Sequence, residues 1–128
     1  FRSRIKKKVE IDEMHSDGLR LKIILNNLVS NAIKYSDKDK KDKFIEIAVL
    51  NEGHALKIEV KDNGVGINKE IQTKIFEMFF GTDHNLGSGL GLYITKEAVE
   101  NLNGSITVTS EVKQGSTFTV IIPKYHET

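Results

Sequence analysis

The residue types with chemical potential in this sequence gather in three short clusters. They are Asn27–Asn31 (Asn-Leu-Val-Ser-Asn), Asp62–Ile67 (Asp-Asn-Gly-Val-Gly-Ile) and Gly87–Leu92 (Gly-Ser-Gly-Leu-Gly-Leu). Amides offer oxygen to a hard cation and N–H to phosphate, an ionised carboxylate only accepts hydrogen bonds, and glycine lets the backbone approach a ligand closely. In this order along one short chain, the clusters are typical of a nucleotide pocket.

A polar strip is expected on a helix that spans about residues 16–35. Asn27, Asn31 and Lys34 have the i, i+4, i+7 spacing that places side chains on one helix face. The apolar stripe that would face the core lies beside them and comprises Leu21, Ile24, Leu25, Leu28, Ala32 and Tyr35. The amides could hold a cation and phosphate, and Lys34 adds a positive charge. Asparagine is also common on solvated helix surfaces, so the strip alone leaves both interpretations open.

Asp62 falls at the end of a predicted strand, in the phase of its buried residues. Residues 45–49 and 56–60 alternate apolar and polar, and continuing the second alternation puts Asp62 on the apolar face. A buried carboxylate costs free energy unless donors meet it, so we expect Asp62 to bind a ligand; the amino group of adenine is a matching donor. Gly64 and Gly66 would let a flat ligand lie against the turn, although Asn-Gly also favours a plain hairpin.

The glycines at 87–91 lead into a helix that we expect over about residues 88–103. Unpaired N–H groups and the positive dipole end at a helix N-terminus favour phosphate. No Gly-Lys-Ser/Thr follows and no strand comes immediately before. The cluster is therefore neither a P-loop nor a dinucleotide-binding fingerprint.

The remaining pattern predicts one α/β domain. An edge strand is expected over residues 4–10, a short helix over 68–78, and two strands over 106–108 and 118–122 around a turn at 114–115. Helices and strands are interspersed without repeated βα units, which favours a two-layer sandwich with a mixed sheet. A length of 128 residues suits a single domain.

Composition excludes several other classes of protein. The net charge of +1 gives no basis for binding nucleic acid through bulk electrostatics, and the absence of cysteine excludes disulfides and thiolate metal sites. No apolar run reaches membrane-spanning length, and the four histidines lack metal-ligand spacing. The mixed-charge loop Lys38–Lys43 is expected to be solvated surface, with weak steering of an anionic ligand as the alternative. Because the chain begins with Phe1, we expect it to be cut from a longer protein.

Taken together, the clusters resemble the ATP-binding catalytic domain of two-component sensor histidine kinases, part of the superfamily of gyrase, the heat-shock chaperone ATPase and the mismatch-repair ATPase. The asparagine box of that family resembles residues 27–35, its glycine boxes 62–67 and 87–92, and its phenylalanine box 75–80. The resemblance runs from about residue 17 to 123. It implies the Bergerat fold: an α/β two-layer sandwich with a mixed, mostly antiparallel sheet covered by about three helices. Residues 1–128 would be one catalytic domain without its phosphoacceptor domain.

The resemblance also implies roles for individual residues in binding ATP and Mg²⁺. Asp62 would bind the adenine amino group, with Ser116 helping through water, and Tyr35 would pack against the base. Asn31, with Asn27 beside it, would hold Mg²⁺. The residues that would shape the adenine pocket are Gly64, Gly66 and Ile67, and those that would meet the phosphates are Lys34, Gly87, Gly89, Leu90, Gly91 and Leu92.

One position separates kinase from ATPase in this resemblance. Hydrolytic relatives carry a glutamate where this chain has Asn27, and an amide cannot act as a general base toward water. The γ-phosphoryl group would therefore pass to a histidine on a dimerisation domain outside this chain.

The implied partners are that phosphoacceptor domain and, indirectly, a response regulator, with no nucleic acid and no direct membrane contact. The domain would be cytoplasmic, in a parent protein that family habit places at the membrane.

The segment before the second glycine box departs from the family. Phe76, Phe79 and Phe80 are expected to pack at the start of a polar lid over residues 81–86. The basic residue that usually follows the aromatic pair is absent, since Gly81 comes next. An alternative therefore stays open: a nucleotide-binding or interaction module with a degenerate lid and no transfer activity. A related serine kinase is a third interpretation, but its relatives usually carry an acidic residue at the position of Asn27.

Overall fold

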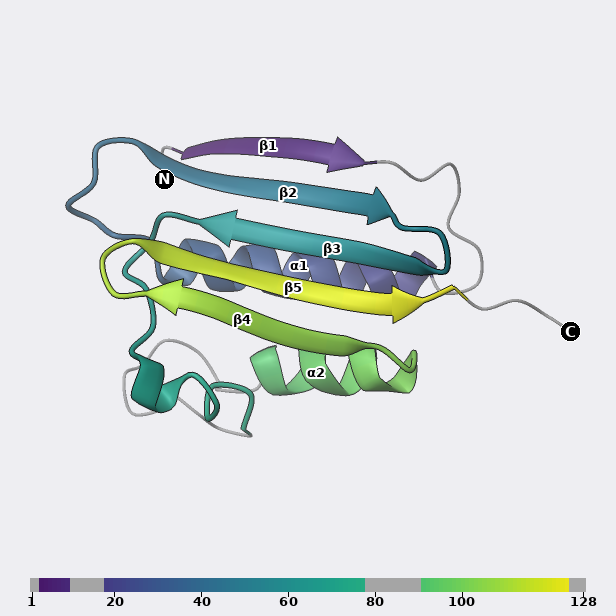
Figure 1. The fold of residues 1–128 in the computed structure, drawn as a ribbon. Helices are drawn as coiled ribbons and strands as arrows, with labels where there is room; N and C mark the ends of the chain where they lie inside the picture. The colour runs from purple at the N-terminus through teal and green to yellow at the C-terminus, as the bar shows by residue number, and fades with distance from the viewer. Residues whose placement is uncertain (1–2, 10–17, 78–90, 125–128) are drawn as a thin grey trace, which may run out of the picture.

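A mixed sheet forms one layer of the fold and helices form the other (Figure 1). The computed structural model describes residues 3–9, 18–77 and 91–124. Its five strands lie in the order β1-β2-β3-β5-β4, and only β1 is parallel to its neighbour. The strands are β1 (Ser3–Val9), β2 (Lys43–Asn51), β3 (Ala55–Asp62), β4 (Ser105–Glu111) and β5 (Gly115–Pro123). The predicted two-layer architecture, mostly antiparallel sheet and N-terminal edge strand are confirmed.

The helix α1 (Gly18–Lys34) covers the sheet with the apolar stripe expected from its sequence. Leu21, Ile24, Leu28 and Ala32 are buried, while Leu25 packs against the same core at a partly buried position. The helix lies behind β3 and β5 in Figure 1 and packs against β3 and the second helix. Burial of this stripe, rather than intrinsic propensity, supplies most of the stability of such a helix.

The inner face of the sheet supplies the other half of the core. Every second residue of the central strands is buried, as the alternation predicted: Ile45, Ile47, Val49, Leu56, Ile58, Val60, Phe118, Val120 and Ile122. Phe118 meets Phe76 edge-to-face at 6.1 Å between ring centroids. Phe76 therefore belongs to the hydrophobic packing, as expected; Phe79 and Phe80 lie outside the described residues.

The prediction of a helix over residues 68–78 was wrong in type. This segment contains one turn of 3-10 helix, η1 (Lys69–Ile71), followed by turns that continue to residue 76. Its backbone bonds join residues three apart, as in Lys74 N–H to the Ile71 carbonyl at 2.9 Å. Only Ile75 is buried here, so no apolar stripe stabilises a longer α-helix. The described residues of the helical layer thus form two α-helices and η1, in agreement with the expected number of about three helices.

The second helix, α2 (Gly91–Asn101), ends as predicted. Asn103 adopts a left-handed conformation with φ of 62°, and the Gly104 N–H donates to the Val99 carbonyl at 2.9 Å. A Cβ at Gly104 would lie 2.5 Å from the Ile121 carbonyl oxygen, so glycine also permits close packing on the sheet. The predicted start of this helix near residue 88 lies outside the described residues.

Gly66 and Gly53 have nearly the same positive φ but different surroundings. A comparison of the two can therefore distinguish the cost of backbone strain from the cost of a steric clash. Gly66 and Gly53 have φ values of +78° and +75°. A Cβ at Gly66 would lie 2.0 Å from the Glu111 carbonyl oxygen, whereas a Cβ at Gly53 would meet nothing within 4 Å. The turn after β3 can therefore touch the end of β4 only through a glycine.

We expect Gly66→Ala to lower the free energy of unfolding by at least about 2 kcal/mol more than Gly53→Ala, because both pay backbone strain but only the first forces the turns apart. Urea unfolding followed by circular dichroism measures both values. Equal losses would mean that the contact between the two turns adds nothing to stability.

Candidate functional site

Asp62 is the last residue of β3 and points to the inner face of the sheet, as its phase predicted. It is only 7% exposed. Its Oδ1 accepts a hydrogen bond from the Gly64 N–H at 2.8 Å. Burial raises the pKa of Asp62, although the backbone N–H groups of Gly64 and Ser116 and the positive charge of Lys40 act to lower it. The fold therefore holds this carboxyl group where ionisation is costly, which is typical of a group that serves a ligand.

The turn after Asp62 docks on the end of α1. The Val65 N–H donates to the Tyr35 carbonyl oxygen at 2.9 Å. A Cβ at Gly64 would lie 2.3 Å from that same oxygen, so this approach needs glycine. The turn leads from β3 to η1 rather than back along the sheet, which excludes the plain hairpin. Asp62 and Tyr35 are thereby brought to one place, and burial raises the pKa of the half-buried Tyr35.

A chain of hydroxyl and amide groups joins the turn to β4 and β5. The Ser110 and Ser116 hydroxyl oxygens lie 2.7 Å apart, and the Ser110 hydroxyl donates to the Gly115 carbonyl at 2.8 Å. The Ile67 N–H donates to Ser110 Oγ at 2.8 Å. Ile67 and Ser116, predicted from separate parts of the sequence, thus meet through Ser110.

Sequence reasoning missed Ser110 and Gln72 in this network. The Gln72 side-chain amide donates to the Ile67 carbonyl at 2.8 Å and to the Ser110 carbonyl at 3.1 Å. A signal for Ser110 was present, because it follows Ile106 and Val108 in the buried phase of β4. This is the same pattern that singled out Asp62. Gln72 carried no comparable signal.

Asn27, Asn31 and Lys34 lie on α1 in the predicted order, approaching the end that contacts the turn after β3. Both asparagines are half-buried, and Lys34 in the last turn is exposed. Among the described residues, neither asparagine side chain has a hydrogen-bond partner, so both amides are available to a ligand.

Of the second glycine box, only the C-terminal part falls within the described residues. Gly91 begins α2 and is exposed, while Leu92 is half-buried against the core. The buried Thr95 hydroxyl donates to the Gly91 carbonyl at 2.7 Å and secures this first turn. The predicted phosphate-binding residues Gly87, Gly89 and Leu90, and the predicted lid, lie outside the described residues.

The loop after α1 is held to the turn by two residues, Asn63 and Lys40, to which the sequence assigned no role of their own. Asn63 Oδ1 accepts from the Phe44 N–H at 2.9 Å, and its Nδ2 donates to the Asp42 carbonyl at 2.7 Å. Lys40 Nζ donates to the Asn63 carbonyl at 2.8 Å and to the Lys113 carbonyl at 2.7 Å. The prediction of solvated surface for this loop is wrong at Lys40, because this half-buried residue donates to two backbone carbonyls.

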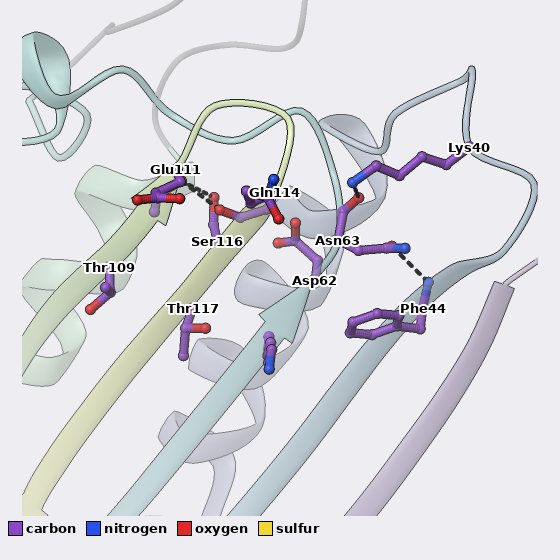
Figure 2. Close-up of a pocket in the computed structure, with 12 residues that line it drawn as sticks. Lys40, Phe44, Asp62, Asn63, Thr109, Glu111, Gln114, Ser116 and Thr117 are labelled. Carbon is purple, nitrogen blue, oxygen red and sulfur yellow. Dashed lines mark hydrogen bonds between the residues drawn. The ribbon is translucent and has the colours of Figure 1, made fainter.

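A cavity of about 510 Å³ opens at the same end of the sheet, on the face away from the helices (Figure 2). Figure 2 shows Phe44 on β2, Thr117 on β5 and Thr109 on β4, with Asp62 at the end of β3 and Asn63 just beyond it. The other lining residues are Lys40, Lys61, Ser110, Glu111, Gln114, Gly115 and Ser116. The cavity shares a wall with the predicted nucleotide site but opens on the opposite face.

Two features are absent from the described ranges, 3–9, 18–77 and 91–124. These ranges contain no group of three or more His, Asp or Glu side chains that could hold a metal ion. They also contain no helix that is long and apolar enough to cross a membrane.

Comparisons with known proteins identify the family to which the chain is similar. The family model described as histidine kinase-, DNA gyrase B-, and HSP90-like ATPase matches residues 16–126. The aerobic respiration control sensor protein ArcB of Escherichia coli strain K12 is 40% identical over 114 residues, which cover 84% of this chain and 14% of ArcB. The chain thus spans a small part of the length of this curated relative.

Solved structures show the same fold. The nucleotide-free catalytic domain of the histidine kinase ThkA has a TM-score of 0.78 and 30% identity, covering 95% of this chain and 78% of that one. Full-length ShkA in complex with AMPPNP also has a TM-score of 0.78, at 27% identity, and covers 93% of this chain and 25% of that one. Because a single family model spans most of the chain and the fold agrees, the chain belongs to the histidine kinase-, DNA gyrase B- and HSP90-like ATPase family, as an ATP-binding catalytic domain of the sensor histidine kinase type.

Proposed function

We propose that this domain binds ATP with Mg²⁺ and donates the γ-phosphoryl group to a histidine of a dimerisation domain outside the chain, in two-component signalling. The observation that carries the proposal is the buried Asp62 carboxyl group at the end of β3, with Tyr35 and Ser116 beside it. Such a group can accept a hydrogen bond from the adenine amino group. The solved ShkA complex with AMPPNP, a relative at 27% identity, supports nucleotide binding by this fold.

The adenine end of the site is formed by the turn after β3. Asp62 accepts from the amino group of the base, and Ser116, paired with Asp62 in the sheet register, assists through a water molecule. Tyr35 packs against the base. Gly64 and Gly66 let the turn lie close to the neighbouring backbone, and Ile67, half-buried against the core, closes the pocket.

The phosphate and metal end is formed by α1 and the start of α2. Mg²⁺ commonly binds one or two protein oxygens together with substrate phosphates, and the half-buried amides of Asn31 and Asn27 fit that need. When bound, the metal neutralises charge on the phosphates. Lys34 adds a positive charge, and the second glycine box supplies backbone N–H groups, with Gly91 and Leu92 at the N-terminus of α2.

The side chain at Asn27 indicates whether the γ-phosphoryl group passes to water or to a histidine. An amide has no basic lone pair with which to activate water, so hydrolysis lacks its general base. A histidine nitrogen of the phosphoacceptor domain instead attacks the γ-phosphorus; the P–N bond forms, the bond to the bridging oxygen breaks, ADP leaves, and the displaced histidine proton passes to solvent. A response regulator then receives the phosphoryl group. We place the domain in a longer, membrane-anchored parent with this part on the cytoplasmic side.

Asp62→Asn is expected to weaken ADP binding by about 1.5–3 kcal/mol, roughly ten- to a hundredfold, because a charge-assisted hydrogen bond is lost. Calorimetric titration measures the affinity. Glu59→Gln is the matched control, since Glu59 lies on the same strand but on the outer face. An unchanged affinity in Asp62→Asn would remove this residue from the adenine site.

Asp62→Asn weakens nucleotide binding, but it is expected to favour the folded state of the unliganded protein as the pH rises. Because burial raises the pKa of Asp62 above its ordinary value of 3.8, the folded state binds this proton more tightly than the unfolded chain. The stability of the wild type relative to Asp62→Asn should therefore fall as pH rises from 3.8 through the raised pKa. Denaturant unfolding across that window tests the sign, and a rising difference would contradict it.

Asn31→Ala is expected to weaken binding of a non-hydrolysable ATP analogue about tenfold with Mg²⁺ present and by about twofold or less with a chelator, because the metal ligand is lost. Asn26→Ala, at an exposed asparagine of the same helix, is the matched control. Equal losses with and without Mg²⁺ would defeat the metal assignment.

A phosphotransfer assay distinguishes the proposed kinase domain from a nucleotide-binding module with a degenerate lid. The purified domain with radiolabelled ATP should label a supplied phosphoacceptor domain of its parent with acid-labile, base-stable phosphate. By itself it should turn over ATP far below the roughly 10 s⁻¹ of a median enzyme. Tight ATP binding without transfer would favour the module, and fast hydrolysis would contradict the argument from Asn27.

A further inference from the structure

The loop between α1 and β2 is folded so that Lys40 stands over the end of the sheet. Asp37 starts the turn, with its Oδ1 accepting from the Asp39 N–H at 3.0 Å and its carbonyl accepting from the Lys40 N–H at 3.1 Å. Such a side-chain turn at aspartate fixes the local backbone without tertiary contacts. Lys40 is half-buried, whereas Lys38 and Lys41 beside it are exposed.

The ammonium group of Lys40 joins two turns that are far apart in the sequence. Nζ donates to the Asn63 carbonyl at 2.8 Å and to the Lys113 carbonyl at 2.7 Å (Figure 2 shows the first). Hydrogen bonds from a charged donor are stronger than those between neutral groups. Lys40 thus links the end of β3 to the turn between β4 and β5.

Both of these turns border Asp62. Asn63 is its neighbour in the chain, and the Lys113 N–H donates to the Val65 carbonyl at 2.7 Å, which closes the connection from the other side. A Cβ at Gly115 would lie 2.0 Å from the Asp62 carbonyl oxygen, so the β4–β5 turn presses directly on the residue. Displacing either turn would move the Asp62 carboxyl group.

The charge of Lys40 acts on the same group. It lowers the pKa of Asp62 and so opposes the effect of burial. One side chain therefore both fixes the backbone around Asp62 and favours its ionised form. A lysine whose ammonium group is surrounded by water would not hold this backbone and would not favour ionised Asp62.

We propose that Lys40 is a positioning residue for adenine recognition: its bonds to the Asn63 and Lys113 carbonyls hold the Asp62 carboxylate in place to accept from the amino group of the base. The inference rests on the proposed function, since it takes Asp62 as the residue that reads adenine. It assigns part of the specificity of the site to a loop outside the asparagine and glycine boxes.

The test compares ADP with purine riboside diphosphate, which lacks the 6-amino group, by calorimetric titration. Wild-type protein should prefer ADP by about tenfold or more, because the analogue leaves Asp62 without a donor. Lys40→Met should reduce this preference to about threefold or less, and Lys40→Arg should recover most of it. Lys41→Met removes the same charge from an exposed position of the same loop and should keep the full preference.

The outcomes are distinct. If Lys40→Met keeps the full preference, or if both affinities fall equally, Lys40 does not act through Asp62 and the inference is overturned. Lys40→Gln, which keeps an N–H donor without charge, gives the same comparison should the methionine variant fail to fold. A wild type without preference for ADP would overturn the role of Asp62 itself, and this result is visible before any Lys40 variant is measured.

Discussion

The burial of one carboxyl group at the end of β3 is the constraint on which the rest of this site depends. Asp62 occupies a position that its strand neighbours fill with isoleucine and valine, and there its ionised form is unfavourable. Backbone N–H groups of Gly64, in the turn after β3, and of Ser116, in β5, offset part of that cost together with the nearby Lys40. The close approach of the turns through glycine follows from this requirement, because donors must come within hydrogen-bond distance of a buried acceptor.

The middle of the fold and the end that contains Asp62 differ in the residues that they contain. The core between α1 and the inner face of the sheet is apolar throughout its middle, and it fixes the helix relative to the strands. The polar residues gather at one end, where α1 finishes and β3 ends. The Tyr35 carbonyl, bonded to the Val65 N–H, ties the layers together at that point. An apolar body thus carries a small group of polar residues at one end.

Members of one family share this fold while catalysing different reactions, so the fold does not decide between hydrolysis and transfer. Under the proposed function, that choice lies in the side chain at Asn27. An amide at Asn27 can offer oxygen to a cation but cannot accept a proton from water.

Local patterns in the sequence were enough to predict α1, the alternating strands and the buried phase of Asp62, since each depends on periods of 3.6 or 2 residues. The segment after β3 was predicted as a helix and forms η1, because its few apolar residues have too little core to pack against. Lys40, Asn63, Gln72 and Ser110 acquired their roles only in three dimensions. Lys40 binds a carbonyl 73 positions away, and such a contact exists only after the sheet has brought β3 and β5 together. Periodicity acts over a few residues, whereas the partners of a buried polar group are chosen by the tertiary fold.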